Sequence, residues 1–222
     1  MSEIVSYTVD DGVAVVTMDD GKANAMAPAM SAALNAALDR ADKDARAVVI
    51  RGRPGVFCGG FDLKIIRGAD EALKATMRQA GMELALRLYL SPLPVVFACT
   101  GHAMAMGAVL LLAGDARIGV AGDFKVGLNE TAIGLSLPQP ALELARDRIP
   151  PTELTNAVIS ANIYTPDDAV RIGYLDRAVA PGVFDATVMA TARALGELDR
   201  TAFATTKQRL RQATVDRIKA SA

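Results

Sequence analysis

One acidic residue stands alone in an otherwise small and apolar stretch, VGLNETAIGLSLP, at residues 126–138. The neighbours of Glu130 would solvate its carboxylate poorly, so we expect its pKa to rise. A carboxylic acid with a raised pKa is a usable base near neutral pH. The same position could instead be a helix cap, since Asn129 and Thr131 both cap helices well. The stretch by itself leaves a catalytic base and a cap as alternatives.

A glycine turn at residues 55–64, GVFCGGFDLK, could supply hydrogen-bond donors. Adjacent Gly59 and Gly60 permit backbone conformations that other residues rarely adopt, and such a turn leaves N–H groups that point one way. Asp62 stands where a new helix could begin, a place that suits a short acid. An ordinary strand-to-helix turn is the alternative interpretation.

A second turn, TGHAMAMGAVLLLAGD at residues 100–115, also leads from a predicted strand into a helix that begins near Met106. The first N–H groups of a helix have no internal partner and lie at the positive end of its dipole. Two N–H groups from separate turns could hold one carbonyl oxygen while the glutamate moves a proton on the adjacent carbon. Together they would stabilise an enolate. His102 has no visible partner in the sequence, and we interpret it as structural.

The composition excludes several other kinds of site. One histidine and two cysteines, Cys58 and Cys99, are too few for a multi-histidine metal site, a four-thiolate zinc site or a disulfide framework. The net charge is -1 and the pI is about 5.9, with no basic stripe for nucleic acid or a membrane surface. The apolar run at 103–114 is too short to span a bilayer, and the first residues lack a secretory signal. We therefore expect a cytoplasmic protein with no metal.

The segments that must position the three turns alternate between strands and helices. IVSYTV and VAVVTM flank DDG and predict a hairpin, and from residue 138 onward the pattern is mainly helical. Apolar spacing predicts helices at 27–44 and 72–90. Short apolar or β-branched runs predict strands at 45–52, 93–101, 116–121, 123–127 and 174–181. This alternation predicts an α/β core.

Six segments in order resemble the crotonase, or enoyl-CoA hydratase/isomerase, superfamily. They are DDGKANAM, FCGGFDLK, GHAMAMGAVLLLAGDARI, LNETAIGLSLP, TPDDAVRIGYLDRAV and FATTKQRL, and the resemblance covers nearly the whole chain. It implies a spiral of ββα units with a helical C-terminal region. Residues 1–195 would form the core, and residues 196–222 a helix that packs in a homotrimer or a dimer of trimers.

The resemblance also implies a ligand and the residues that hold it. The ligand would be an acyl-CoA thioester of fatty acid metabolism, with no metal or redox cofactor, because coenzyme A is part of the substrate. The thioester oxygen would accept hydrogen bonds from the backbone N–H groups of Phe61 and Met106. The resemblance further implies that the following residues contact CoA or the acyl group: Ala23 and Ala25 through their backbones, Asp62, Leu63, Lys64, Val109, and Phe203 and Lys207 in a segment that often reaches the CoA of a neighbouring subunit.

Where the chain departs from the family pattern, it suggests which reaction is catalysed. Hydratases of the family use two glutamates, and this chain keeps Glu130 but has Val109 at the other position. GLNETAIGL resembles Δ3,Δ2-enoyl-CoA isomerases, which use a single glutamate. We therefore expect isomerisation with Glu130 as the sole acid and base. The alternatives are a hydratase of modest rate, thioester hydrolysis or decarboxylation, and a non-catalytic acyl-CoA-binding protein. The family usually has glycine where Ala105 and Met106 stand, and the methionine side chain could narrow the acyl pocket.

Overall fold

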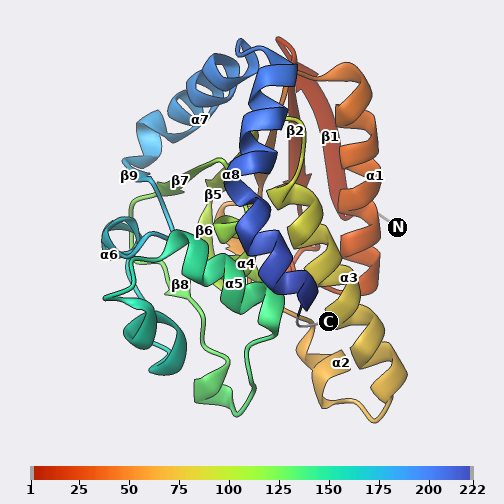
Figure 1. Cartoon of the computed structure of the whole chain (residues 1–222), viewed down its shortest axis with the longest axis vertical. Coiled ribbons are helices and arrows are strands. Elements are labelled where there is room, and N and C mark those ends of the chain that lie inside the picture. Colours follow the sequence, from red (N-terminus) through yellow and green to blue (C-terminus); the bar gives the residue numbers. More distant parts are fainter. Residues whose placement is uncertain (1–2, 221–222) are drawn as a thin grey trace.

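The computed structural model describes residues 3–220 (Figure 1). In chain order its elements are β1 (Val5–Asp10), β2 (Val13–Met18), α1 (Pro28–Asp44), β3 (Ala47–Arg51), β4 (Gly55–Cys58), α2 (Leu63–Arg67), α3 (Glu71–Tyr89), β5 (Val95–Cys99), β6 (Gly101–Met104), α4 (Met106–Leu112), β7 (Ala116–Val120), β8 (Val126–Gly127), α5 (Gln139–Arg148), α6 (Pro166–Ile172), β9 (Arg177–Val179), α7 (Pro181–Gly196) and α8 (Arg200–Ala220). The α/β class that the alternation predicts is confirmed. Among the described residues, no helix combines the length and apolarity needed to cross a membrane.

The larger sheet has the strand order β1-β2-β3-β5-β7-β9 and is parallel except for the first pair. The predicted hairpin is confirmed: β1 and β2 are antiparallel, and Asp11 and Gly12 between them both have positive φ. Positive φ at both central residues is the geometry of the tight turns that match the twist of a hairpin.

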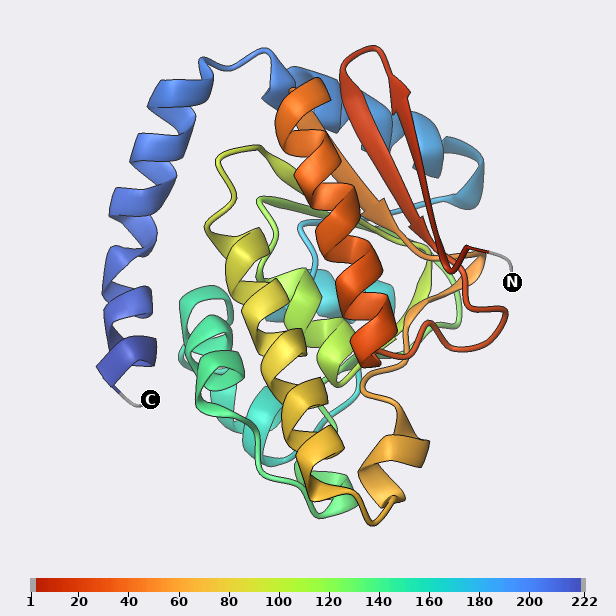
Figure 2. The same ribbon diagram turned by 90° about the vertical axis from the view of Figure 1, so that its right-hand side faces the viewer.

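Both faces of this sheet are buried, which explains why its central strands are apolar throughout. In β3, Val48 and Ile50 face one apolar cluster, and Ala47 and Val49 face another. Helix α1 packs over the first face and α7 over the second, as the two perpendicular views show (Figures 1 and 2). The α7 side chains in the second cluster recur every four residues and are Phe184, Val188 and Ala192.

A second, three-stranded parallel sheet has the order β4-β6-β8. The sequence pattern missed most of it. Residues 101–104 form the strand β6 rather than a glycine turn, and the strand expected at 123–127 is reduced to Val126–Gly127. These strands are two to four residues long, too short for periodicity to be visible.

The C-terminal half also contains one exception to the expected helices. Within the predicted helical stretch at 151–160, Thr155–Ile159 form a single wide π-type turn.

Helix α8 folds back over the same subunit, with Arg211 donating to the Tyr89 carbonyl and Arg217 paired with Glu143. In Figure 2 it runs along one side of the molecule. The division into a core at 1–195 and a packing helix at 196–222 stays a prediction.

Candidate active site

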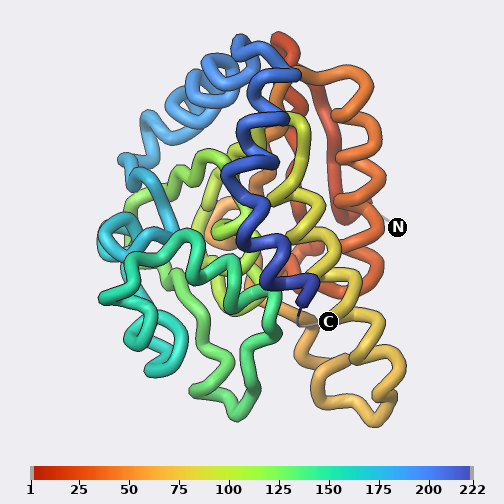
Figure 3. Tube along the Cα trace, in the orientation of Figure 1, coloured from red at the N-terminus to blue at the C-terminus, as the bar shows by residue number. Residues whose placement is uncertain are grey.

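The three turns singled out in the sequence follow the three strands of the smaller sheet. Cys58 of β4 pairs with Ala103 of β6, and Met104 of β6 pairs with Gly127 of β8. Because the strands are parallel, their carboxyl ends lie at one edge, where open α/β sheets commonly bind ligands. In Figure 3 the segment that follows β8 and the segment around α2 both lie at the lower end of the molecule.

The Phe61 N–H points toward this edge. The Gly60 carbonyl accepts a hydrogen bond from Met26 N at 2.8 Å. A trans peptide directs its C=O and N–H in opposite directions, so the Phe61 N–H points away from Met26. Gly60 has φ +102°, and a Cβ there would lie 3.0 Å from the Ala105 Cβ and 3.7 Å from the Met106 nitrogen. Glycine is therefore required, and it brings the first turn against the second.

The Met106 N–H is the first donor of α4. The Ala105 carbonyl accepts from Val109 N at 3.0 Å and so points along the helix, which leaves the Met106 N–H pointing out of its N-terminus. Ala105 N donates to the Gly127 carbonyl at 3.0 Å, which joins this turn to β8. Ala105 has φ +51° and ψ -118°, a conformation that glycine adopts more readily. Of the two positions where the family usually has glycine, the strain lies on Ala105, the residue before the donor, because Met106 is not among the residues with positive φ.

A cavity of about 300 Å³ lies at this edge. Its lining residues are Gly59, Phe61, Leu63, Ile66, Arg67, Ala105, Asn129, Glu130, Ile133 and Leu135. Residues from all three turns are present, and Glu130 is the one acid among them. Sequence analysis did not single out the four lining residues Ile66, Arg67, Ile133 and Leu135. Ile66, Ile133 and Leu135 gave only the weak signal of apolar residues after a glycine or polar turn, and Arg67 gave none.

Glu130 is not a cap. It precedes a 3₁₀ turn at Thr131–Ile133, but its side chain makes no capping hydrogen bond. Its Oε2 is buried without a partner among the described residues. Burial raises the pKa of Glu130, against the lowering effect of the backbone N–H groups of Glu130 and Asn129. The structure therefore contradicts the cap interpretation and leaves a partly desolvated carboxyl group in the cavity that Phe61 and Ala105 also line.

Val109 lies in the first turn of α4, where it is 1% exposed and packs in the main core. It is not among the residues that line the cavity in the described part of the chain. Where the resemblance to hydratases would place a second glutamate, this chain has a buried aliphatic group, which can neither deliver a proton nor hold water.

The turn that carries Ala23 and Ala25 lies next to the cavity wall. The Ala23 carbonyl accepts from Gly59 N at 2.8 Å, and the Ala25 N–H donates to the Asp20 carboxylate at 3.1 Å. Carbonyl oxygens have two lone pairs, so that of Ala23 can accept a second hydrogen bond.

Two residues that sequence reasoning missed hold this turn. Asn24 is buried at φ +50°, and its side chain donates to the carbonyls of Met18 and Phe57. Burial would raise the pKa of Asp20, but backbone N–H groups led by that of Asn24 hold it below its usual value. The signal that could have identified them is an acid and an asparagine four apart around a glycine, which is typical of side-chain-to-backbone turns.

The three residues at the start of α2 lie in different surroundings. Asp62 caps the helix, accepting from Lys64 N at 2.7 Å, as its position predicted. Leu63 is half-exposed and lines the cavity. Lys64 is exposed, and its ammonium has no ion-pair partner among residues 3–220.

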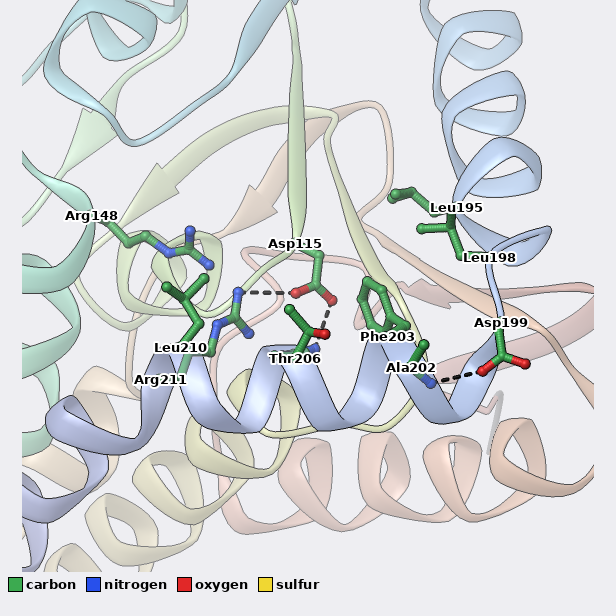
Figure 4. A pocket seen from close by; sticks show the side chains of 11 residues that line it. Asp115, Arg148, Leu195, Leu198, Asp199, Ala202, Phe203, Thr206, Leu210 and Arg211 are labelled. Carbon is green, nitrogen blue, oxygen red and sulfur yellow. Dashed lines mark hydrogen bonds and ion pairs between the residues drawn. The ribbon is translucent and has the colours of Figure 1, made fainter.

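Phe203 and Lys207 lie elsewhere, in a hollow of about 510 Å³ between α8 and the end of α7 (Figure 4). Its lining residues do not include any that line the Glu130 cavity. Lys207 Nζ lies 2.7 Å from Asp115, which also pairs with Arg211 at 2.9 Å. Burial lowers the pKa of Lys207 to about 8, although the Asp115 carboxylate acts in the opposite direction. The structure thus places these two residues together, but not at the Glu130 cavity of the same subunit.

The remaining nucleophile and base candidates are structural. His102 Nδ1 accepts a hydrogen bond from Lys125 N at 2.9 Å, and its ring packs edge-on against Phe124. Burial raises the pKa of Cys58 and Cys99 to about 12, so both thiols are protonated at neutral pH.

Comparisons with known proteins agree with this arrangement. The enoyl-CoA hydratase/isomerase family model matches residues 8–221. The mitochondrial enoyl-CoA delta isomerase 1 of Homo sapiens is 29% identical over 211 residues, which cover 93% of this chain and 70% of that protein. Among other curated relatives, the match covers 45% of a probable enoyl-CoA hydratase from Rhodobacter capsulatus and 75% of a probable enoyl-CoA hydratase from Mycobacterium avium.

Solved structures give the same result. A probable enoyl-CoA hydratase, EchA3, from Mycobacterium tuberculosis superimposes with a TM-score of 0.94 at 43% identity, covering 98% of this chain and 92% of that one. An apo structure of the same M. tuberculosis protein, described there as an enoyl-CoA isomerase, also has a TM-score of 0.94 at 43% identity, covering 99% and 96%. With its crotonase fold and a family match over nearly all its length, the chain belongs to the enoyl-CoA hydratase/isomerase family.

Proposed function

We propose that this chain is a Δ3,Δ2-enoyl-CoA isomerase in which Glu130 is the only acid and base. One observation carries the proposal: a single carboxyl group, largely buried and with a raised pKa, lines a cavity that is otherwise without acids among the described residues. The proposal is supported by the direction of the Phe61 and Met106 N–H groups and by the burial of Val109.

The reaction follows from these positions. The two N–H groups hold the thioester oxygen while Glu130 takes a proton from C2 of a 3-enoyl thioester. The electron pair spreads over the carbonyl and the C3–C4 double bond as a dienolate, and Glu130 returns the proton to C4. No other reactant is consumed and no oxidation state changes. An oxyanion donor contributes about 2.7–4 kcal/mol to such a transition state, and a positioned base contributes roughly 10²–10⁴-fold.

Hydration is the alternative that a test must separate, because relatives are named both hydratase and isomerase. Adding water to a 2-enoyl thioester requires an oriented water and a proton delivered to the neighbouring carbon. Isomerisation requires only one group that first accepts and then donates a proton. A site with one carboxyl group therefore suits the second reaction better.

The test offers the purified protein 3-enoyl-CoA and 2-enoyl-CoA of equal chain length in heavy water, with mass spectrometry of the products. We expect the 3-enoyl substrate to become its 2-enoyl isomer and the 2-enoyl substrate to gain no water. Glu130→Gln should lose turnover by at least 10² while still binding a saturated acyl-CoA. Ready addition of water to the 2-enoyl substrate would contradict the proposal. Full activity of Glu130→Gln would exclude Glu130 as the acid and base.

We also propose that the chain assembles as a homotrimer or a dimer of trimers. Two leucines that line the hollow between α7 and α8 support an interface there, since Leu198 is 52% and Leu210 is 78% exposed. Light scattering measures the mass directly. Leu210→Lys should reduce it, whereas Leu73→Lys, a matched change on α3 where the leucine is 40% exposed, should not. A monomeric wild-type protein would contradict this proposal.

A further inference from the structure

The ring of Phe61 is held between the cavity and the backbone of helix α3. It lines the cavity on one side, and on the other a Cβ placed on Gly81 would lie 2.6 Å from Phe61 Cε1 and 2.9 Å from Cζ. That distance is too short for any real contact, so only glycine at position 81 lets the ring rest there. The Phe61 ring therefore separates the cavity from helix α3 at Gly81.

Gly81 has no backbone reason to be glycine. It lies inside α3, which runs without a break from Glu71 to Tyr89, and it is not among the glycines with positive φ. A glycine within a helix weakens the helix, so its presence requires another explanation. Close approach of the Phe61 ring supplies one. The Met106 methyl group, 3.6 Å from the same Cβ position, lies beside the ring.

The cavity that the Phe61 ring closes is apolar on most of its lining. Phe61, Leu63, Ile66, Ile133 and Leu135 contribute aliphatic or aromatic side chains. Such a lining suits a hydrocarbon chain. At about 30 Å³ for each water-sized group, a volume of about 300 Å³ holds roughly ten non-hydrogen groups. The sulfur and oxygen of a thioester leave room for about eight carbons.

We propose that the Phe61 ring, seated on Gly81, sets the length of the acyl chain and restricts the substrate to short and medium acyl-CoA thioesters of up to about eight carbons. The choice of an acyl-CoA ligand rests on the proposed function, but the length limit concerns binding and not chemistry. Phe61 therefore has two independent roles: its backbone N–H faces the thioester oxygen, and its side chain closes the acyl end of the cavity.

The test measures the affinity of saturated acyl-CoA thioesters of 4, 6, 8, 10 and 12 carbons by calorimetry. Each methylene that enters the cavity should tighten binding about fourfold, so the wild-type affinity should rise up to about eight carbons and then level off. We call the chain length at which the affinity stops rising the break. Phe61→Ala should move the break to longer chains. Gly81→Ala should push the ring into the cavity and move the break to shorter chains.

Phe124→Ala is the matched control, because Phe124 packs against His102 and does not line the cavity. It should leave the break where it is. Phe61→Leu, a smaller change, should move the break in the same direction as Phe61→Ala and serves if the larger truncation does not fold. An unmoved break in every folded Phe61 variant would overturn the proposal, as would a wild-type affinity that keeps rising to 12 carbons.

Saturated thioesters are bound but not turned over, so this result does not depend on which reaction the protein catalyses. A break that moves, in a protein that fails to isomerise, would support the length limit and contradict only the proposed function. An active isomerase whose break does not move would support the proposed function and contradict the length limit.

Discussion

Ala105→Gly should stabilise the protein, against the usual effect of introducing glycine. Ala105 stands immediately before helix α4, whose first N–H is the proposed oxyanion donor, with φ +51° and ψ -118°. A non-glycine residue held in such a region costs roughly 1–3 kcal/mol. Glycine removes that strain, but the more flexible unfolded chain offsets about 0.4–1 kcal/mol of it. The net gain should be about 0.5–2 kcal/mol.

Urea unfolding measures this gain. For an m-value of about 1–3 kcal/mol/M, a gain of 1 kcal/mol moves the midpoint upward by roughly 0.3–1 M at constant m. The matched control is Ala113→Gly at the other end of α4, where φ is -82° and the side chain is fully buried. There the same substitution should cost about 1–2 kcal/mol, from backbone entropy and one lost methyl group.

Activity should move in the opposite direction from stability. A glycine at 105 loosens the peptide that aims the Met106 N–H, so kcat should fall, though by less than the 10²–10³-fold that follows complete loss of a donor. If Ala105→Gly destabilises the protein as much as Ala113→Gly does, position 105 carries no strain and the reasoning is wrong.

Other substitutions test the charge and the close contact at the site, and the buried lysine on α8. Glu130→Gln should stabilise the protein at pH 8 by up to about 1–2 kcal/mol, since it replaces a buried carboxylate with a neutral group. Because the folded-state pKa of Glu130 lies above its ordinary value of 4.5, the folded form is favoured below that value and loses this advantage as pH rises through the folded pKa. Urea unfolding should therefore show the gain at pH 8 and not at pH 4. Burial lowers the pKa of Lys207 to about 8, whereas the unfolded chain keeps that proton to about pH 10.4. The wild type should therefore gain stability relative to Lys207→Met between pH 8 and 10, and equal slopes would contradict the shift. Gly60→Ala should cost roughly 1–3 kcal/mol, because φ is +102° and the new Cβ would lie 3.0 Å from that of Ala105. An unchanged melting temperature would show that this turn can relax.

The larger sheet was well predicted from the sequence because local pattern and tertiary environment agree there. Strand β3 is apolar at successive positions because helices α1 and α7 cover both its faces. The hairpin has turn residues with positive φ between two β-branched runs. Helix α1 begins at Pro28, within a residue of the predicted start at 27, and a proline suits the first turn of a helix.

The smaller sheet was not predicted, although it positions the site. Its strands are so short that a glycine turn and a strand look alike in the sequence, as residues 101–104 show. The interpretation of Glu130 depended on this sheet. The sequence allowed a cap or a base, and only the fold showed that its carboxyl group makes no capping bond and lines the same cavity as Phe61 and Ala105.

What the sequence alone determined is local chemistry: one acid in an apolar stretch, paired glycines after a strand, and a helix beginning after another. Only the tertiary structure decided that these parts meet. The pairings Cys58 with Ala103 and Met104 with Gly127 place the three turns at one edge. Contacts between residues so far apart in the chain follow from packing and from the hydrogen-bond register between strands, which no local pattern specifies.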